Sequence, residues 1–557
     1  MIQFNNFSFR YKNQAEPTLK HINLSINNGE KVLILGPSGS GKTTLIQCLN
    51  GLIPNQFAGE ITGTSTVAGH PVGDSSVFAL SKKVGTVLQD ADAQFVGLSV
   101  GEDIAFYLEN QAIELDEIKR DVLKAAEKVG IASQLGQLPF NLSGGQKQKV
   151  AVAGVLHDDK PVMVFDEPLA ALDPKMGTDM IDLIDQINQQ QGKTVIIIEH
   201  RLEEVLYRHV DRIILLAEGA IVSDTTPDDL LRGNLLQQYG IREPLYLRTF
   251  KKVLGGLKQT NHLTNVEDLN LTDVQSVALD LERTAVPEGP DGDPIIKLKK
   301  VEFSYDNDDF IQIPELTIHR GERISLIGGN GTGKSTLAKL LTGVLRPHHG
   351  TIEIDGVATK KKTIREIAES VAYVMQDPNQ MIVKNTVEEE VGLALTIRGI
   401  TGDEYTNRVD RALNAAGFYP MRHWPISSLS YGQKKRLSVA SLLVLNPEVL
   451  ILDEPTAGQD LKHYQEMMTF IDQLNQTYGT TIIFITHDMH LALEYTDRAI
   501  VLGAGHILAD DDPYNVLGND ALCRQSHLRP TSIFELAKRL NLAPRDLVSA
   551  TIQGGGN

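Results

Sequence analysis

The chain is poor in cysteine, in aromatic residues and in long apolar runs. Its 557 residues include two cysteines, Cys48 and Cys523, too few for a disulfide framework, a zinc ribbon or an iron–sulfur cluster. No apolar run approaches the ~20 residues that span a bilayer, and the first residues show no apolar core of a signal peptide. We therefore expect a cytoplasmic chain that is soluble by itself.

Basic residues are also scarce relative to acidic ones. Lys and Arg number 53 against 71 Asp and Glu, which gives a net charge of −18. This excess of acid disfavours nucleic-acid binding, because such a site needs a basic face that neutralises phosphates. It does not exclude ATP, since a triphosphate can be held by backbone N–H groups and one or two lysines.

What the chain does contain is one long internal repeat. Lys334 repeats Lys42 at an offset of 292 residues, and from Gln89 and Gln376 onward the offset is 287. A single duplication of this length indicates two whole domains in tandem rather than a solenoid. We expect domains at 1–240 and 295–527, a helical tail and linker at 241–294, and a C-terminal helical tail at 528–557.

Within each copy, short β-branched runs alternate with helical patterns, as in KVLIL and KTVIII of the first copy and EVLIL and TTIIFI of the second. Runs that are apolar on both faces and separated by helices predict a mostly parallel sheet buried between helices. The start of each copy alternates apolar and polar residues, which predicts a half-exposed antiparallel piece. The predicted fold class is α/β.

Each copy has a glycine-rich segment G-x-x-x-x-G-K-[ST] between a predicted strand and a predicted helix. In such a loop, backbone N–H groups point at phosphate oxygens, the lysine reaches the β- and γ-phosphates, and the last hydroxyl, Thr43 or Ser335, ligates Mg²⁺. The nucleotide-binding candidates are Gly36, Pro37, Ser38, Gly39, Ser40, Gly41, Lys42, Thr43 and Thr44, and Gly328, Gly329, Asn330, Gly331, Thr332, Gly333, Lys334, Ser335 and Thr336.

Two apolar strands end in an Asp-Glu pair, Asp166–Glu167 and Asp453–Glu454. The aspartate at the end of the strand can hold Mg²⁺, and the glutamate can polarise an attacking water as a general base. A histidine follows 34 residues after each aspartate, at His200 and His487. An imidazole at that position can touch the γ-phosphate and help to fix the water.

The segments LSGGQ (142–146) and LSYGQ (429–433), called signature segments below, each precede a long helical pattern. A serine at the N-cap of a helix, together with bare backbone amides, forms an anion site. This anion site lacks a lysine of its own, which suggests that it completes a site built mainly elsewhere. The candidate residues are Ser143, Gly144, Gly145, Ser430 and Gly432.

The order of phosphate loop, glutamine, signature segment, Asp-Glu strand and histidine resembles that of the ABC (ATP-binding cassette) ATPases over nearly the whole chain. The resemblance implies two P-loop NTPase domains in tandem, each with a mostly parallel sheet, an antiparallel β piece and an α-helical subdomain. It implies ATP and Mg²⁺ as cofactors. In that family two cassettes pair head to tail. Here they would pair within one chain, with Lys42 facing Ser430 and Lys334 facing Ser143.

The resemblance also implies roles for single residues. Gln89 and Gln376 would be the glutamines that contact both the reacting water and Mg²⁺, and Tyr11 and Tyr305 would stack on adenine. The implied catalytic set is Glu167, Glu454, His200, His487, Gln89 and Gln376, and the implied metal ligands are Thr43, Ser335, Gln89, Gln376, Asp166 and Asp453.

A narrower resemblance is to the ATPases of energy-coupling-factor (ECF) importers of vitamins, metals and other small molecules. It is carried by QDPNQ (376–380) and, with Ala for Pro and one residue more, by QDADAQ (89–94). In that family this region receives a helix of a membrane partner. The resemblance implies two integral membrane partners, a coupling protein and a substrate-binding component, at the cytoplasmic face of the membrane. The expected docking residues are Phe95, Val96, Leu98, Met381, Ile382 and Val383, with acids at Glu102, Asp103, Glu389 and Glu390.

Two other functions stay open. A tandem ABC ATPase of the ribosome or translation-factor type resembles this chain in lacking membrane spans, but the segment between its cassettes is typically long, helical and highly charged. A tandem sugar-importer ATPase usually has a degraded second phosphate loop, whereas GGNGTGKS is intact. We also expect unequal ATP sites, because Tyr431 stands where the first copy has Gly144, and AGQD (457–460) where it has AALD (170–173).

Overall fold

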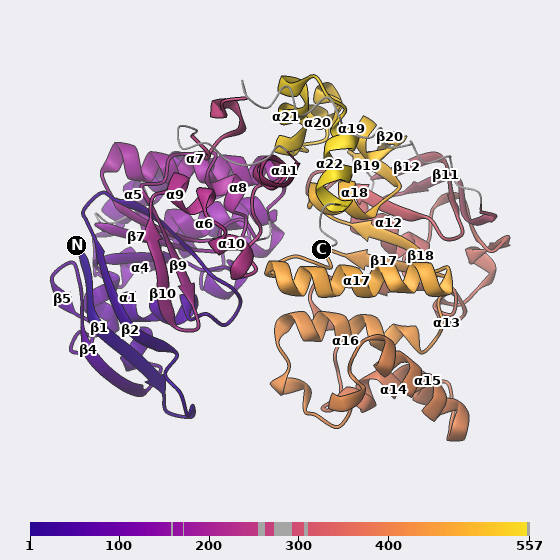
Figure 1. Cartoon of the computed structure of the whole chain (residues 1–557), viewed down its shortest axis with the longest axis horizontal. Helices are drawn as coiled ribbons and strands as arrows, with labels where there is room; N and C mark the ends of the chain where they lie inside the picture. Colours follow the sequence, from indigo (N-terminus) through magenta and orange to yellow (C-terminus); the bar gives the residue numbers. More distant parts are fainter. Residues whose placement is uncertain (157–159, 171, 254–261, 272–291, 306–309, 554–557) are drawn as a thin grey trace. The chain divides into compact units, whose positions relative to one another are not determined.

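The computed structural model describes residues 1–156, 160–170, 172–253, 262–271, 292–305 and 310–553. The chain forms two compact units, Met1–Leu279 and Asp280–Asn557 (Figure 1). Ala171, and residues 254–261 and 272–291 of the expected tail and linker, lie outside the described residues. Within the described ranges, no helix combines the length and the apolar character needed to cross a bilayer.

Unit 1 contains two sheets. An antiparallel sheet has the order β2-β1-β4-β5, and a six-stranded sheet has the order β10-β9-β3-β8-β7-β6, parallel except for β10. The strands are β1 (Ile2–Tyr11), β2 (Leu19–Ile26), β3 (Lys31–Leu35), β4 (Gly59–Val67), β5 (His70–Pro71), β6 (Val84–Val87), β7 (Val162–Asp166), β8 (Thr194–Ile198), β9 (Arg212–Ala217) and β10 (Ala220–Thr225).

The helices of unit 1 cover the six-stranded sheet and form a helical subdomain of α4, α5 and α6, which pack on one another. They are α1 (Lys42–Leu49), α2 (Leu52–Asn55), α3 (Val77–Ser81), α4 (Val100–Glu109), α5 (Leu115–Val129), α6 (Gly144–Leu156), α7 (Pro174–Gln191), α8 (Leu202–Val205), α9 (Pro227–Arg232), α10 (Leu235–Gln238) and α11 (Leu245–Val253).

Unit 2 repeats this architecture, with sheets β12-β11-β14-β15 and β16-β17-β18-β13-β19-β20. The first sheet is antiparallel, and the second is parallel except for β20. The strands are β11 (Pro294–Phe303), β12 (Ile311–His319), β13 (Arg323–Ile327), β14 (His349–Ile354), β15 (Val357–Ala358), β16 (Val371–Val374), β17 (Val449–Asp453), β18 (Thr481–Ile485), β19 (Arg498–Gly503) and β20 (His506–Asp511).

In unit 2 the helical subdomain consists of α14, α15 and α16, gathered at one end of the unit (Figure 1). The helices are α12 (Lys334–Leu341), α13 (Ile364–Ile367), α14 (Val387–Ile397), α15 (Gly402–Ala415), α16 (Tyr431–Leu443), α17 (Leu461–Tyr478), α18 (Met489–Tyr495), α19 (Pro513–Leu517), α20 (Asp520–Gln525), α21 (Ser532–Leu540) and α22 (Pro544–Gln553). The predicted fold class is therefore confirmed in both units, parallel core and antiparallel piece included.

The central strands carry their apolar residues on both faces, as the sequence pattern predicts. β3, β8 and β18 are buried along their whole length, so helices must cover both sides of the sheet. Strands that are buried on both faces can present functional groups only at their ends. The carboxyl ends of β3, β7 and β8, and of β13, β17 and β18, therefore form the two edges at which the sites described below are built.

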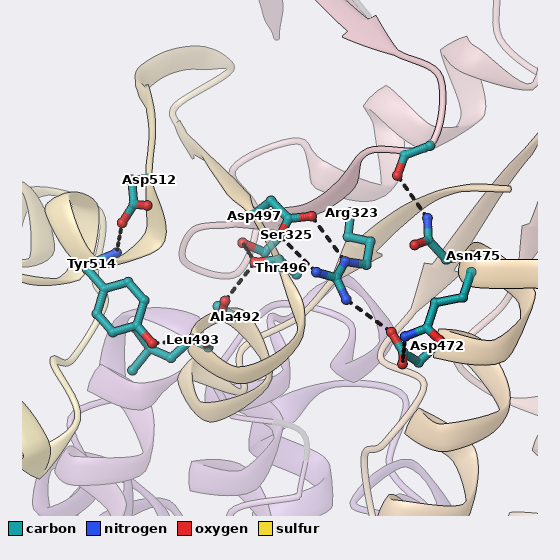
Figure 2. A network of polar contacts seen from close by, with 12 residues as sticks. Arg323, Ser325, Asp472, Asn475, Ala492, Leu493, Thr496, Asp497, Asp512 and Tyr514 are labelled. Carbon is teal, nitrogen blue, oxygen red and sulfur yellow. Dashed lines mark hydrogen bonds and ion pairs between the residues drawn. The ribbon is translucent and has the colours of Figure 1, made fainter. Parts of the chain in front are cut away.

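The strand that leads into the second phosphate loop is anchored at its other end by a polar network (Figure 2). Arg323 donates to Asp472 on α17 at 3.0 Å and to both carboxylate oxygens of Asp497 at 3.0 and 2.8 Å. Two residues along the strand, Ser325 accepts a hydrogen bond of 3.2 Å from the hydroxyl of Thr496. Hydrogen bonds to charged groups contribute more than neutral ones, so this network fixes the position of β13.

Candidate functional site

Each phosphate loop joins a central strand to a helix. Residues 36–43 connect β3 to α1, and residues 328–335 connect β13 to α12. Lys42 Nζ is buried and donates to the carbonyls of Gly36 at 2.8 Å and Pro37 at 2.9 Å. Lys334 Nζ donates in the same way to the first two carbonyls of its loop, both at 2.8 Å. The two loops therefore curl around their own lysines in the same way.

The curl depends on glycine at the entry to each helix. Gly41 and Gly333 both have φ +102°, in a region that residues with a Cβ rarely adopt. At the other end of the first loop, a Cβ on Gly36 would lie 2.2 Å from the carbonyl oxygen of Leu216. Glycine is therefore required at Gly41 and Gly333 by the backbone conformation and at Gly36 by its close packing against β9.

The two predicted adenine-stacking tyrosines occupy equivalent places beside the phosphate-loop helices. Tyr11 ends β1, and its hydroxyl lies 3.1 Å from Thr44 Oγ1 and donates to Gln47 Oε1 at 2.9 Å. The hydroxyl of Tyr305 lies 3.1 Å from Thr336 Oγ1, and its ring is 56% exposed. The rings are held close to the phosphate loops, and stacking on adenine remains a prediction.

In unit 1 the structure brings three predicted catalytic side chains together. Gln89 Nε2 donates to Glu167 Oε2 at 2.7 Å, and His200 Nε2 lies 3.2 Å from Glu167 Oε1. Glu167 follows β7 and His200 follows β8, so the meeting results from two parallel strands that end at the same edge. A carboxylate held from both sides in this way suits a general base that must keep one orientation.

Unit 2 repeats this arrangement in part. His487 Nε2 lies 3.7 Å from Glu454 Oε1, and the hydroxyl of Thr486 donates to Glu454 Oε2 at 3.4 Å. Gln376 is exposed, and among the hydrogen bonds of the described residues none joins it to Glu454. The glutamine and the glutamate therefore meet in unit 1 but not in unit 2.

Both glutamates have a strained backbone. Glu167 has φ +47° and Glu454 has φ +46°, in the left-handed region that non-glycine residues seldom occupy. The backbone N–H of each donates to the end of the adjacent strand, to Ile198 at 2.9 Å and to Ile485 at 2.8 Å. Strain of this kind, held by the surrounding structure, concentrates at functional sites.

Of the aspartates at the strand ends, Asp166 is half-buried and Asp453 is buried, and their environments differ. Burial, reinforced by the charge of Glu167, raises the pKa of Asp166 to about 6. Asp453 accepts hydrogen bonds from Tyr373 at 2.6 Å and from Ser335 at 3.2 Å. Burial raises the pKa of Asp453 while these two donors oppose the rise. Burial, followed by repulsion from Asp453, raises the pKa of Glu454 to about 7.

The carboxylates and hydroxyls at the two strand ends suit Mg²⁺, which takes few protein ligands, better than a metal ion held by protein ligands alone. The described residues contain no cluster of three or more His, Cys, Asp or Glu that could hold a metal ion. Mg²⁺ usually keeps several waters and takes one or two carboxylates plus substrate phosphates. Ser335 with Asp453 offers a hydroxyl and a carboxylate of that kind, whereas no hydrogen bond among the described residues joins Thr43 to Asp166.

The serine of each signature segment caps the N-terminus of the helix that follows it. Ser143 Oγ accepts from the N–H of Gln146 at 3.3 Å, and Ser430 Oγ accepts from the N–H of Gln433 at 3.2 Å. In each case the glutamine side chain accepts from the serine N–H in return, which forms a capping box. No described contact joins either segment to the phosphate loop of its own unit.

Sequence reasoning missed five residues that the structure places around these groups. Tyr373 contacts Asp453; Glu199 and Arg201 contact the segment after Glu167; Lys435 contacts the segment after Glu454; and a Cβ on Gly329 would lie 3.1 Å from Nδ1 of His527. A signal was present in the repeat, because at offset 287 these positions are Thr86, Thr486, Asp488, Gln148 and Gly240 in the other copy.

Comparison with known families matches both units. A family model described as ABC transporter matches residues 19–170 and 311–457. A second model, described as ATP-binding cassette cobalt transporter, matches residues 233–303, which include the segment between the two cassettes. Together they account for most of the chain.

Two relatives resemble the chain over nearly its full length. A protein of Enterococcus faecalis, named an ABC transporter ATP-binding protein, is 52% identical over 97% of this chain and 96% of its own length. A protein of Lactiplantibacillus plantarum with the same name is 48% identical over 99% and 98%. Among solved structures, that of the RNase-L inhibitor covers 92% of both chains with a TM-score of 0.58 and 21% identity, a likeness of fold alone.

Proposed function

This chain belongs to the ABC transporter family as an ATP-binding, ATP-hydrolysing protein with two cassettes, and from this premise we propose that it powers an importer of the energy-coupling-factor type. The observation that carries the ATP-hydrolysing part of the proposal is a phosphate loop and a catalytic glutamate at the sheet edge of each unit. A subunit that only binds nucleotide would not need an oriented glutamate beside both phosphate loops.

In the proposed mechanism each unit binds the triphosphate of ATP with its phosphate loop and its lysine. Thr43 with Asp166, and Ser335 with Asp453, would hold Mg²⁺, which neutralises charge on the phosphates when bound. Glu167 and Glu454 would take a proton from the attacking water. The neighbouring histidines would orient the base, as the contact of His200 with Glu167 already does in unit 1.

The head-to-tail pairing of the two cassettes is part of the proposal. Each signature segment presents a capped helix N-terminus, a site for anions. Because neither serine contacts the phosphate loop of its own unit among the described residues, each is available to complete the ATP site of the other. ATP would then draw the two units together and release them after hydrolysis.

Transport is proposed on the likeness of residues 233–303 to the ATP-binding cassette cobalt transporter model. The partners would be an integral membrane coupling protein and a substrate-binding component, with this chain at the cytoplasmic face of the membrane. Purification of the tagged chain from its native membrane, followed by mass identification of its partners, tests this directly. Recovery of two such membrane proteins is the expected result, and recovery of ribosomal proteins instead would contradict it.

The docking surface is proposed at the segments after the two glutamines, on the apolar side chains there that are most exposed. Met381 and Ile382 are half-buried against the core of unit 2, and Phe95 is also half-buried, so these three side chains offer less surface to a partner. Val96, Leu98 and Val383 are instead 63%, 78% and 68% exposed. These three side chains form the proposed docking set.

The acids of this region hold the docking segments in place. Asp103 accepts from the N–H groups of Val96 at 2.7 Å and Gly97 at 3.0 Å. Glu390, which is buried, accepts in the same way from Val383 at 2.9 Å and Lys384 at 2.8 Å. The carboxylates therefore satisfy the local backbone, and the apolar side chains between them point to solvent. Exposed apolar residues on a fixed backbone are typical of interaction sites.

We expect Leu98→Asp combined with Val383→Asp to abolish co-purification with the membrane partners, because each change puts a charge into a surface that must lose water. The ATPase rate of the purified chain should stay near the wild-type value. Val344→Asp, at a 55% exposed valine outside this region, is the matched control and should still bind the partners. Normal recovery of partners with the double variant would contradict this docking surface.

The two ATP sites are proposed to be unequal. In the head-to-tail arrangement Tyr431 and Gln459, which depart from the first copy, both face the site of Lys42. The Tyr431 ring lies 5.4 Å from the ammonium of Lys435 and is 43% exposed, so it projects beside the helix N-terminus that would bind phosphate. A bulky ring there would slow closure on ATP without removing Ser430.

We expect Tyr431→Gly to raise the turnover of the Lys42 site several-fold, because glycine frees the backbone beside Ser430. The measurement uses a Glu454→Gln background, in which residual hydrolysis reports the Lys42 site. Gly144→Tyr in a Glu167→Gln background is the reciprocal variant and should slow the other site. Equal rates with and without Tyr431 would contradict a limiting role for this residue.

A further inference from the structure

The loop that follows each catalytic glutamate is held by a cation, and the cation comes from a different element in each unit. In unit 1 Arg201, just before α8, donates from Nη1 to the carbonyls of Leu169 at 2.7 Å and Leu172 at 3.3 Å. In unit 2 Lys435, on α16, donates from Nζ to the carbonyls of Glu454 at 2.7 Å and Ala457 at 3.0 Å. Both cations thus bind carbonyls of the segment that begins at the general base, and Lys435 binds the carbonyl of Glu454 itself.

The two cations lie at different positions of the repeat, and each position carries another residue type in the other unit. The position of Arg201 is Asp488 in unit 2, and the position of Lys435 is Gln148 in unit 1. Gln148 instead donates to the carbonyl of Gln89 at 3.3 Å, and Asp488 accepts the N–H groups at the start of α18. Each unit therefore lacks the cation of the other at the matching position.

Glu199 accompanies Arg201 in unit 1. Its carboxylate, 2% exposed, accepts from the N–H of Leu169 at 2.9 Å, of His200 at 2.7 Å and of Arg201 at 3.0 Å. It therefore ties the loop after Glu167 to the backbone of the catalytic histidine. The residue at this position in unit 2 is Thr486, whose hydroxyl reaches Glu454 itself.

Burial explains why these residues change together. A carboxylate without water must be paired or hydrogen-bonded, and Glu199 has three N–H donors and the guanidinium of Arg201 nearby. Lys435 is likewise buried, which lowers its pKa to about 8, and the charges of Glu454, Asp453 and Asp377 oppose that change. Loss of Arg201 alone would leave the buried carboxylate of Glu199 without its nearby cation. Lys435 alone, placed where its carboxylates are missing, would be a buried cation without partners.

We infer that the Glu199–Arg201 pair in unit 1 and Lys435 in unit 2 are equivalent positioning elements, each of which sets the place of the general base by holding the loop that follows it. The inference rests on the proposed role of Glu167 and Glu454. It predicts that the loop of unit 1 can be held by the residues that hold the loop of unit 2, and that the loop of unit 2 can be held by those of unit 1.

The test converts unit 1 in two steps. Glu199→Thr with Arg201→Asp removes both members of the pair and introduces the residues of unit 2, so that the buried Glu199 is not left without Arg201; the partly exposed Glu204 loses its ion pair with Arg201. We expect faster hydrogen exchange of the peptide that contains Leu169 and Leu172. We also expect kcat in the Glu454→Gln background to fall about tenfold with KM for ATP unchanged, because a small misplacement of a base lowers the rate.

Addition of Gln148→Lys then supplies the cation from the signature helix, as in unit 2. We expect this third substitution to restore most of the protection from exchange and most of kcat. In unit 2, Lys435→Gln should have the same two effects, and Thr486→Glu with Asp488→Arg should reverse them. Arg208→Asp, at a partly exposed arginine that pairs with Asp182, is the control for the charge change alone.

Two results would overturn the inference. One is unchanged exchange of the loop in the Glu199→Thr/Arg201→Asp variant, and the other is failure of Gln148→Lys to restore it. Hydrogen exchange is measured on the full chain without nucleotide. It therefore tests whether these residues hold the loop even if Glu167 is not the general base. Normal turnover in the Glu167→Gln/Glu454→Gln chain would count against the proposed base and not against the contact.

Discussion

Replacement of both glutamates by glutamine, Glu167→Gln with Glu454→Gln, is expected to lower ATP turnover by about a hundredfold or more, the usual contribution of a general base. Glutamine keeps the size of the side chain and can still meet Gln89 or His200, but it cannot accept the proton of the attacking water. Neither carboxylate is a proposed nucleotide ligand. ATP should therefore bind with near-normal affinity.

The measurement pairs steady-state hydrolysis with binding of a fluorescent ATP analogue. Glu117→Gln is the matched control, because this carboxylate is exposed in the first turn of α5, outside the site. The control should hydrolyse ATP at a rate close to that of the wild type. Near-normal turnover of the double variant would contradict the assignment of the base in both units.

The parts of the site that the sequence could predict are those whose chemistry is local. A phosphate loop needs its glycines, its lysine and its hydroxyl within eight residues, so GPSGSGKT predicts a phosphate site by itself. The meeting of Glu167 with His200 also follows from sequence, because two predicted parallel strands must end at the same edge of the sheet. The equal spacing in both copies supports the same conclusion for unit 2.

The parts that could not be predicted depend on side chains far apart in the chain. Lys435 contacts Glu454 across 19 residues and Arg201 contacts Leu169 across 32. No periodicity announces either contact. Met381 shows the same limit, since an apolar residue after the glutamine can dock a partner or pack on the core, and only the folded unit shows that it is half-buried against the core. Burial decides such cases, and burial is a property of the folded unit.

Substitution of the phosphate-loop lysines is expected to weaken the binding of ATP rather than to slow the chemical step. Lys42→Ala or Lys334→Ala removes a buried ammonium that organises two carbonyls of its own loop and would bind the phosphates. Hydrogen bonds to charged groups contribute about 1.5–3 kcal/mol each, so the loss of the lysine is expected to weaken ATP binding at that site by at least about tenfold.

Calorimetric titration of ATP into chains that also carry the Glu167→Gln and Glu454→Gln changes measures binding without turnover. We expect two ATP molecules per chain for the parent, one for either lysine variant and none in the same concentration range for both together. Lys339→Ala, on the same helix as Lys334 but partly exposed, is the control and should leave the stoichiometry at two. Because the two phosphate loops share one geometry around their lysines, loss of one site should leave binding at the other. Two bound ATP molecules in the double lysine variant would contradict the role of these loops as the nucleotide sites.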